Sequence, residues 1–392
     1  MAGPLDGIRI LDLCTIYSGP ICASILGDQG ADVVKVESPA GDFMRTPAGV
    51  SRNGVGAAFA MMNRNKRSVV LDLKTADGKA VFEKLVETAD VVMENYRPGV
   101  MERLGIHYEA LKAINPRIVF VSINGVGHSG PYAGRRVYDA IVQSISGIGS
   151  LQADPKVGRP ELINSLICDK LTSMTAAQSI SSALVARERT GVGQRVDISM
   201  LESALFFLWS DNMLPWSLVG DEAPYDWAPS HAGMIRQTKD GFVCVMPVQQ
   251  DEWRGIFAAL DLPVLTEDPA YHTETGIDMV KFNETVDAAF ATFETKVLEA
   301  RLEEQQVPWA RVNPRDEVVN DPQIVAMESL WEYDHPFAGP IRQARPPGRF
   351  SETPSEIFRP SPELGEHTTE VLEEAGYSKD AIRSLRASHA IR

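Results

Sequence analysis

A loop that could hold a phosphate-bearing ligand follows the first predicted strand. The stretch "DLCTIYSGP" (12–20) leaves a short apolar strand and opens a helix, and α/β folds hold ligands at such turns. A dinucleotide site would need the spacing G-x-G-x-x-G, which lets the backbone approach a pyrophosphate. Here the turn reads "YSGP" (17–20), and Gly27 comes too late for that spacing. The pattern disfavours an NAD-type site and leaves another nucleotide-bearing ligand open.

A second candidate is a carboxylate that stands within an apolar run. In "SLICDKLTSM" (165–174), Asp169 and Lys170 separate a predicted buried strand end from a helical spacing that begins at Leu171. The local interpretation of Asp169 is a helix N-cap, because Asp is favoured there and the helix would begin at Lys170. The Glu or Gln that completes a capping box is absent at Thr172. Local rules therefore leave the purpose of this carboxylate open.

The elements that must position these residues alternate between strands and helices. Short apolar runs predict strands near residues 8–13, 31–37, 68–74, 90–95 and 117–127. A helix is expected between the first two strands, where Pro20 can open it. Further helices are predicted at 76–89, from an apolar stripe, and at 173–191, which is rich in Ala, Ser and Thr. Such alternation is typical of a doubly wound α/β domain with a parallel sheet.

The chain changes character after about residue 205. Residues 210–233 are rich in Pro and Trp and show little periodicity, so a linker is expected there. A hairpin is predicted at 233–247, where the polar turn "TKDG" separates two apolar strands. Helices are then expected near 250–261, 280–306 and 364–388. The proline-rich residues 316–355 are predicted to be irregular.

The composition excludes some partners. The 392 residues include 53 Asp and Glu against 38 Lys and Arg, a net charge of -15, which disfavours nonspecific binding to nucleic acid or anionic membranes. We expect no signal peptide, and no apolar run approaches the ~20 residues of a membrane span. The cysteines form no C-x-x-C pair and lie in apolar stretches; they are Cys14, Cys22, Cys168 and Cys244. Free thiols in a reducing compartment, and thus a cytoplasmic protein, are predicted.

Motifs along nearly the whole chain are similar to those of one enzyme family. They are "PLDGIRILDL" (4–13), "GADVVKVESPAGDFMR" (30–45), "NRNKRSVVLDLK" (63–74), "ADVVMENYRPGVMERLG" (89–105), "NPRIVFVSINGVGHSGPY" (115–132), "GVGQRVDISMLESAL" (191–205) and "LGEHTTEVL" (364–372). On these motifs the chain resembles the family III CoA-transferases. That group includes formyl-CoA:oxalate and carnitine CoA-transferases, and the α-methylacyl-CoA racemases are close relatives.

The resemblance implies a fold that the residues alone do not supply. It is an α/β protein with a large Rossmann-like, doubly wound domain and a small α+β domain, joined by long linkers into an interlocked, ring-like homodimer. The implied boundaries are a large CoA-binding domain at 1–210, a linker at 211–232, the small domain at 233–315, a return linker at 316–355 and C-terminal helices at 356–392 that complete the large domain. Long irregular linkers would explain the proline-rich stretches.

The residues separate the transferases from the racemases. Racemases carry a His-Asp pair in a "GHD" pattern, and the matching "GRRVYDAIVQ" (134–143) has Tyr138 in place of the histidine. The racemase-type "EP" element is also missing from "MPVQQDEW" (246–253). Without the imidazole, a two-base proton exchange loses one base. Racemisation is therefore the disfavoured alternative, and an acyl-CoA-binding protein without catalytic activity is another.

The resemblance assigns the chemistry to Asp169. Transferases place a nucleophilic Asp ahead of a helix rich in small residues, as in "CDKLTSMTAAQSISSAL" (168–184). The implied reaction begins when this carboxylate attacks an acyl-CoA thioester and forms a mixed anhydride. CoA thiolate converts the anhydride into an aspartyl-CoA thioester, which the acceptor carboxylate then attacks. A helix N-terminus would keep the carboxylate ionised, so capping and catalysis are compatible.

The resemblance also implies a CoA site. Its counterparts in this chain are Ser18, Leu71, Asp72, Leu73, Lys74, Asn95, Tyr96, Arg97, Arg103, Arg136, Val137 and Tyr138. The four cations would bind phosphate, and Arg can also stack on adenine. The alternative for Lys74 and Arg103 is a solvated surface, and Tyr138 could equally be a core aromatic residue.

Some positions depart from the family pattern. Tyr17 stands where some members have Gln in the loop beside the acyl–CoA junction, and its hydroxyl makes it a second catalytic candidate. Ser38 stands where some members have an Arg that meets the nucleotide, and Arg45 is a candidate replacement. Residues 245–253 lack the glycine-rich flap of the oxalate-specific enzymes, which disfavours oxalate as the acceptor.

No metal and no tightly bound cofactor are expected. Four histidines show no metal-binding spacing and are interpreted as structural; they are His128, His231, His335 and His367. The expected partners are CoA, acyl-CoA and small carboxylic acids, with transfer either between two molecules or between two carboxyls of one diacid.

Overall fold

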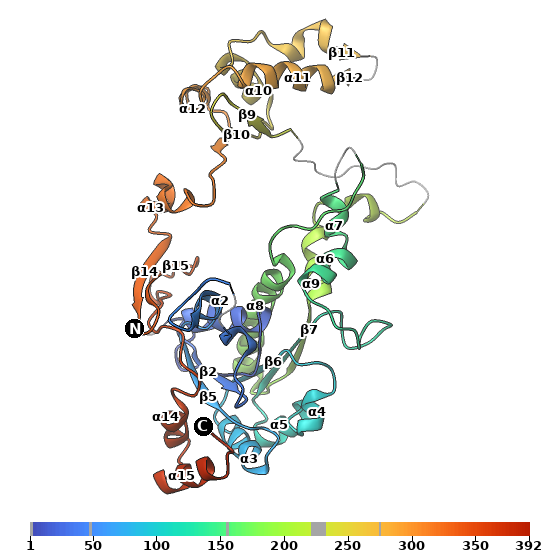
Figure 1. Cartoon of the computed structure of the whole chain (residues 1–392). Coiled ribbons are helices and arrows are strands. Elements are labelled where there is room, and N and C mark those ends of the chain that lie inside the picture. Colours follow the sequence, from blue (N-terminus) through green and yellow to red (C-terminus); the bar gives the residue numbers. More distant parts are fainter. Residues whose placement is uncertain (1–2, 47–48, 154–156, 221–232, 274–275) are drawn as a thin grey trace. The chain divides into compact units, whose positions relative to one another are not determined.

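Two compact units make up the chain. The computed structural model describes residues 3–46, 49–153, 157–220, 233–273 and 276–392. The first unit combines Met1–Asp226 with Glu328–Arg392, and the second is Trp227–Met327 (Figure 1). Of the linker expected at 211–232, residues 221–232 lie outside the described part of the chain.

A six-stranded parallel sheet forms the centre of the first unit. Its strands are β1 (Arg9–Asp12), β2 (Asp32–Glu37), β5 (Lys66–Val70), β6 (Val91–Glu94), β7 (Val119–Asn124) and β8 (Arg195–Ser199). Their order is β5-β2-β1-β6-β7-β8, and every neighbouring pair is parallel. The predicted parallel sheet is confirmed, and β8 is a strand that the sequence patterns did not predict.

Helices cover both faces of this sheet. Ile10 of β1 belongs to an apolar cluster with α1 (Ser18–Asp28) and α8 (Ile167–Thr190). The next residue, Leu11, belongs to the opposite cluster. That second cluster includes α3 (Ala76–Val86), α5 (Tyr108–Ile114), α14 (Thr368–Glu374) and α15 (Lys379–Ala387). Side chains of a strand alternate between faces, so a strand buried on both faces is apolar throughout.

The strand order reverses between β1 and β6. The chain builds outward from β1 through β2 to β5, then returns to β6 and builds outward the other way. In such sheets the loops at the carboxyl ends of the two central strands diverge and leave a crevice. The loops that follow β1 and β6 therefore form the walls of the expected site.

The helix that carries Asp169 begins earlier than predicted. Residues 165–168 do not end a strand, because α8 starts at Ile167 and Leu166 is its N-cap residue. The buried Cys168 side chain packs with Val142 and Met200, so the apolar run is the first turn of a buried helix. Asp169 is the third residue of α8, and the interpretation of Asp169 as the N-cap is wrong.

The remaining elements of the first unit are short. They are η1 (Phe43–Arg45), β3 (Ser51–Arg52), β4 (Val55–Gly56), α2 (Ala57–Met62), α4 (Val100–Leu104), α6 (Asp139–Ser146), α7 (Ile148–Leu151), α9 (Met200–Trp209), η2 (Leu214–Trp216), β14 (Leu330–His335) and β15 (Gly339–Ala344). Of these, α6 and α9 pack with the first turn of α8 around Cys168.

The return segment at 316–355 is more ordered than the sequence indicated. Its prolines suggested irregular chain, but β14 and β15 pair as an antiparallel hairpin. Pro340 is tolerated because a two-stranded hairpin consists of edges only. At the turn, the buried His335 ring accepts from the N–H groups of Phe337 and Ala338 through Nδ1, and Gly339 adopts a left-handed conformation.

The second unit has its own core. The predicted hairpin is confirmed as β9 (Ile235–Gln237) and β10 (Phe242–Val245), and β13 (Trp309–Arg311) pairs with β10. The other elements are α10 (Gln250–Ala259), η3 (Leu265–Glu267), η4 (Pro269–Tyr271), β11 (His272–Thr273), β12 (Gly276–Ile277), α11 (Met279–Phe290), α12 (Thr295–Glu304), η5 (Val318–Asn320) and α13 (Pro322–Ala326). Phe257, Phe282 and Phe290 are fully buried at its centre.

The position of α14 gives a stability test. Leu372 is fully buried in the cluster that covers one face of the sheet. Leu372→Ala should lower the free energy of unfolding by about 2–5 kcal/mol, because the truncation leaves a cavity. Val192, whose side chain is 55% exposed, is the control, and Val192→Ala should stay within ~0.5 kcal/mol. Equal urea-denaturation midpoints for the two variants would contradict this packing.

Candidate functional site

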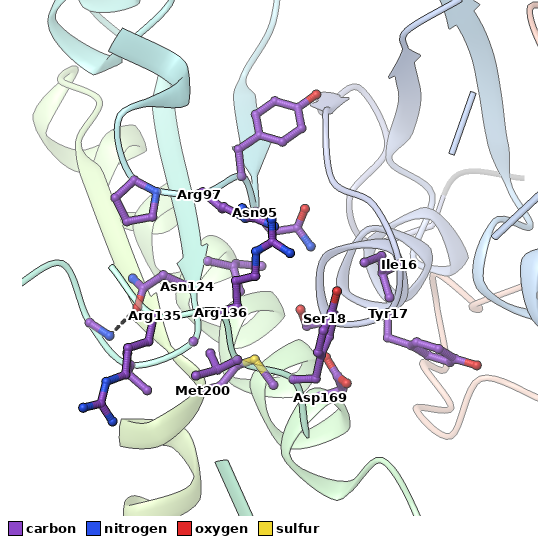
Figure 2. A pocket seen from close by; sticks show the side chains of 18 of the residues that line it. Ile16, Tyr17, Ser18, Asn95, Arg97, Asn124, Arg135, Arg136, Asp169 and Met200 are labelled. Carbon is purple, nitrogen blue, oxygen red and sulfur yellow. Dashed lines mark hydrogen bonds between the residues drawn. The ribbon is translucent and has the colours of Figure 1, made fainter. Parts of the chain in front are cut away.

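A pocket opens at the point where the strand order reverses. Its volume is about 310 Å³, and three loops at strand ends contribute residues 15–18, 95–98 and 123–127. Residues 133 and 135–138 complete the wall together with Asp169 and Met200. Figure 2 shows Ser18 beside Asp169 on one side of the pocket, with Arg97 and Arg136 farther across it. The pocket therefore joins a single carboxylate to a cationic wall.

Opposing influences set the charge of Asp169. The residue is half-buried, and burial is the largest influence, raising its pKa. The nearby Asp139 raises it further, whereas hydrogen bonds from the Ser18 hydroxyl and backbone N–H lower it. The resulting pKa of Asp169 is about 6. At neutral pH most molecules thus hold an ionised carboxylate that is more basic than an exposed Asp.

Asp139 contributes to this environment through a direct contact. Its Oδ2 accepts the backbone N–H of Asp169 at 3.0 Å, which occupies one of the unpaired donors in the first turn of α8. Its Oδ1 accepts from Gln143 Nε2 at 2.6 Å, so the buried carboxylate is held in place. Asp139 therefore orients the backbone of Asp169 while its charge opposes ionisation of the neighbouring side chain.

Three further hydrogen bonds fix the loop that presents Ser18. Ser173 Oγ donates to the Ser18 carbonyl at 2.7 Å, which ties the start of α1 to α8. Thr15 donates its N–H to Asn95 Oδ1 at 2.9 Å and accepts from Asn95 Nδ2 at 2.8 Å. The Asn95 amide thus joins the loops after β1 and β6.

The pocket brings together most of the predicted site residues. Those that line it are Tyr17, Ser18, Asn95, Tyr96, Arg97, Arg136, Val137, Tyr138 and Asp169. Tyr138 is 64% exposed, so the core-aromatic alternative does not apply to it. In Figure 2 the Tyr17 ring extends away from Asp169, and its catalytic role stays a prediction.

Another group of predicted residues lies in a second cavity. Leu73, Lys74 and Arg103 line a hollow of about 640 Å³ together with Lys79, at the start of α3. Both Lys74 and Arg103 are exposed, and the hollow gathers cations from two elements. A cationic hollow at a helix N-terminus suits a phosphate group.

Three predicted or candidate residues are engaged elsewhere. Leu71 is fully buried in the core and forms a bridge with Ile391. Asp72 shapes the turn into α3, because its carboxylate accepts the Lys74 N–H at 3.1 Å. Arg45 donates to Glu37 through two nitrogens and lines neither cavity, so the structure does not favour it as a nucleotide ligand.

Sequence reasoning gave no role to several lining or supporting residues. The main pocket is also lined by Asn124, Arg135 and Met200. Asp139 does not line it but accepts the backbone N–H of Asp169. Asp139 stands in the stretch that was compared with the racemases, directly after Tyr138. The sequence does show that Asp139 stands at the start of an amphipathic helix. It does not show that Asp139 contacts Asp169, because the two residues are 30 positions apart in the chain.

The described residues give two further findings. Among them, no group of three His, Cys, Asp or Glu side chains is arranged to hold a metal ion. No helix in the described ranges is long and apolar enough to cross a membrane. His231 lies outside the described residues.

Comparisons with known proteins extend over nearly the whole chain. Residues 5–368 match the family model described as CoA-transferase family III. The chain is 32% identical to succinate–glutarate CoA-transferase of Agrobacterium fabrum, over 95% of each protein. It is 31% identical to formyl-CoA:oxalate CoA-transferase of Escherichia coli O6:H1, over 100% of each. The crystal structure of a CaiB/BaiF family protein from Brucella suis matches with a TM-score of 0.82 and 30% identity, covering 96% of this chain and 100% of that one.

The contacts of Asp169 predict how its carboxyl titrates. Infrared spectra of ¹³C-Asp-labelled wild type and Asp169→Asn are recorded across a range of pH. Their difference isolates the Asp169 carboxyl, which should titrate with a pKa of about 6. Ser18→Ala removes the hydroxyl donor and should raise this pKa, whereas Asp139→Asn removes a like charge and should lower it. Shifts of the same sign in both variants would contradict the assignment.

Proposed function

This chain belongs to CoA-transferase family III, and from that premise we propose that it moves CoA from an acyl-CoA thioester to a carboxylic acid with Asp169 as the acyl carrier. The observation that carries the proposal is the state of Asp169: half-buried, ionised at neutral pH and held by the Ser18 donors at the edge of the pocket. A nucleophile needs to be ionised yet only weakly solvated.

The reaction divides into four exchanges between activated acyl groups. An Asp169 oxygen attacks the donor thioester, forming an aspartyl–acyl anhydride and releasing CoA thiolate. The thiolate attacks the aspartyl carbonyl, releasing the donor acid and leaving an aspartyl-CoA thioester. The acceptor carboxylate displaces the thiolate to form a second anhydride. The thiolate then takes the acceptor acyl group and regenerates the Asp169 carboxylate.

The residues around Asp169 suit these steps. The Ser18 N–H and hydroxyl, which donate to the resting carboxylate, can donate to the oxygen that gains charge when the aspartyl carbonyl is attacked. An anhydride reacts with water, so it must form where water is scarce. The apolar Ile123, Val137 and Met200 line the same pocket and contribute to that exclusion.

We assign CoA to the main pocket and the second hollow together. Arg97 and Arg136 in the main pocket would neutralise the diphosphate, and Lys74 and Arg103 in the second hollow would bind another phosphate. Asn95 would act on CoA indirectly, since its amide already holds Thr15. CoA enters as a substrate, and no resident cofactor or metal is part of the proposal.

The proposed donors and acceptors are small carboxylic acids. Relatives are named for succinate, glutarate, formyl-CoA and oxalate, and these define the first panel of donors and acceptors to assay. The absence of a glycine-rich flap at 245–253 disfavours oxalate. Diacids that carry CoA on one carboxyl test the intramolecular form of the reaction.

A homodimer and a cytoplasmic location also belong to the proposal. Large apolar side chains are exposed on and after α9, including Phe206 at 84%, Trp216 at 61% and Leu218 at 70%. Large apolar side chains that are this exposed on a single chain suit burial by a second copy. Interlocking of the two copies is carried over from the family, and the free thiols of Cys14, Cys22 and Cys168 suit a reducing compartment.

Two alternatives predict different observations. A racemase would exchange the α-proton of a 2-methylacyl-CoA with solvent deuterium, but Tyr138 stands where racemases have a histidine. A protein that only binds acyl-CoA would show saturable binding without moving labelled CoA to any carboxylate.

Removal of the nucleophile tests the proposal directly. Asp169→Ala should lower transfer by about 10⁴-fold or more while acyl-CoA binding changes little, because only the covalent step is lost. In the wild type, hydroxylamine or borohydride added during turnover should modify Asp169. Asp380→Asn, at an exposed residue, is the control and should behave as wild type. CoA transfer at the wild-type rate in Asp169→Ala would contradict the role of Asp169 as acyl carrier.

The second hollow gives a binding prediction. Lys74→Ala and Arg103→Ala should each raise KM for acyl-CoA by about tenfold, the loss of one charge-assisted hydrogen bond to phosphate, with kcat little changed. Lys84→Ala, in α3 but outside both cavities, is the matched control. Unchanged KM in both test variants would remove this hollow from the CoA site.

A further inference from the structure

The loop that brings Ser18 to Asp169 contains a strained residue. Ile16 has φ = +72°, a left-handed conformation that β-branched side chains seldom adopt. Such a conformation persists only where surrounding contacts determine it, and it recurs at functional sites. Because Ile16 stands two residues before Ser18, its conformation decides where the Ser18 N–H and hydroxyl point.

A buried ion pair holds this strained residue. Asp42 accepts from Lys35 Nζ at 2.9 Å through Oδ2 and from the Ile16 N–H at 3.4 Å through Oδ1. Lys35 Nζ also donates to the Cys14 carbonyl at 2.9 Å. The ion pair therefore binds the backbone on both sides of Thr15, at the Cys14 carbonyl and at the Ile16 N–H. Thr15 itself is bound by Asn95.

The pair does not face either cavity. Lys35 and Asp42 have side chains only 1% and 0% exposed, and neither lines the main pocket or the second hollow. Burial opposes the charged form of Lys35, but the nearby Asp12, Asp42 and Glu37 more than offset it, so its pKa lies above the usual value. Taking two charges out of water is unfavourable, and a buried pair is a poor source of stability by itself. The geometry that the pair fixes is therefore the better explanation of its presence.

We propose that Lys35 and Asp42 are positioning residues of the transfer reaction, which hold Ile16 in its left-handed conformation so that Ser18 presents both of its donors to Asp169. The inference rests on the proposed role of Asp169 as acyl carrier. Without these donors, burial and Asp139 both disfavour the ionised form of Asp169, and only the N–H dipoles at the start of α8 oppose them. The ion pair thus favours ionisation of Asp169 indirectly, through the backbone of residues 16–18.

A variant that removes both charges tests the proposal. Lys35→Met/Asp42→Leu leaves no unpaired partner from this ion pair, so folding should survive, but the Ile16 N–H loses its acceptor. We expect kcat to fall about 10- to 100-fold with KM for acyl-CoA little changed, because a misplaced group slows the chemical step. The Asp169 carboxyl should also titrate at higher pH in difference infrared spectra. If the double variant does not fold, Asp42→Asn provides the same readouts.

A second variant separates positioning from general damage. Glycine adopts the left-handed conformation without strain, so Ile16→Gly should make the loop less dependent on the ion pair. In the Ile16→Gly background, Asp42→Asn should lower kcat by less than about threefold, well below its effect with Ile16 present. Equal losses in the two backgrounds would overturn the proposal.

The matched control is another buried ion pair of the same unit. Asp28 is 2.7 Å from Arg64, with side chains 3% and 16% exposed, and lines neither cavity. Asp28→Asn should leave the Asp169 titration and kcat unchanged.

A folded Lys35→Met/Asp42→Leu variant with wild-type titration and kcat would refute the positioning role, and so would equal shifts in Asp28→Asn. If the wild type catalyses no transfer but the titration still moves only with Lys35 and Asp42, the proposed function fails, whereas the effect of the ion pair on Ser18 and Asp169 is confirmed.

Discussion

The proposed chemistry depends on one constraint: the half-buried Asp169 carboxylate has to stay ionised. Burial and the charge of Asp139 oppose ionisation of Asp169, and the two Ser18 donors favour it, so that its pKa is about 6. The first turn of α8 adds N–H dipoles that stabilise an anion. A more exposed carboxylate would be a weaker nucleophile, and one without donors would have a higher pKa and be less ionised. The proposed acyl transfer requires this balance.

Sheet topology brings the balancing groups together. The loops that hold Ser18 and Asn95 follow β1 and β6, which are neighbours in space although about 80 residues separate them in the chain. Asp139 and Asp169 open two helices that pack around Cys168. Each group is therefore fixed by an element whose position follows from the core, and Ile16 is the non-glycine residue with positive φ among the described residues that line the pocket.

Periodicity predicted the elements whose apolar pattern is regular and missed those that tertiary contacts decide. The parallel sheet and the β9–β10 hairpin followed from apolar runs and a polar turn. The start of α8 was misplaced because a short apolar run fits a strand end or a buried helical turn equally well. Leu71 was assigned to CoA by motif position; its side chain is buried in the core, and its contact with CoA stays a prediction. Asp139 was missed because its contact with Asp169 spans 30 residues, a separation on which local patterns carry no information.

The central claim is that an Asp169 oxygen carries the acyl group through an anhydride. In the proposed scheme an acceptor oxygen bridges the second anhydride and stays with Asp169 when the thiolate removes the acyl group. The most direct measurement is turnover with an acceptor acid labelled with ¹⁸O in its carboxylate, followed by mass spectrometry of the peptide that contains Asp169. The account predicts ¹⁸O in the Asp169 side chain. A peptide that stays unlabelled after many turnovers would contradict it.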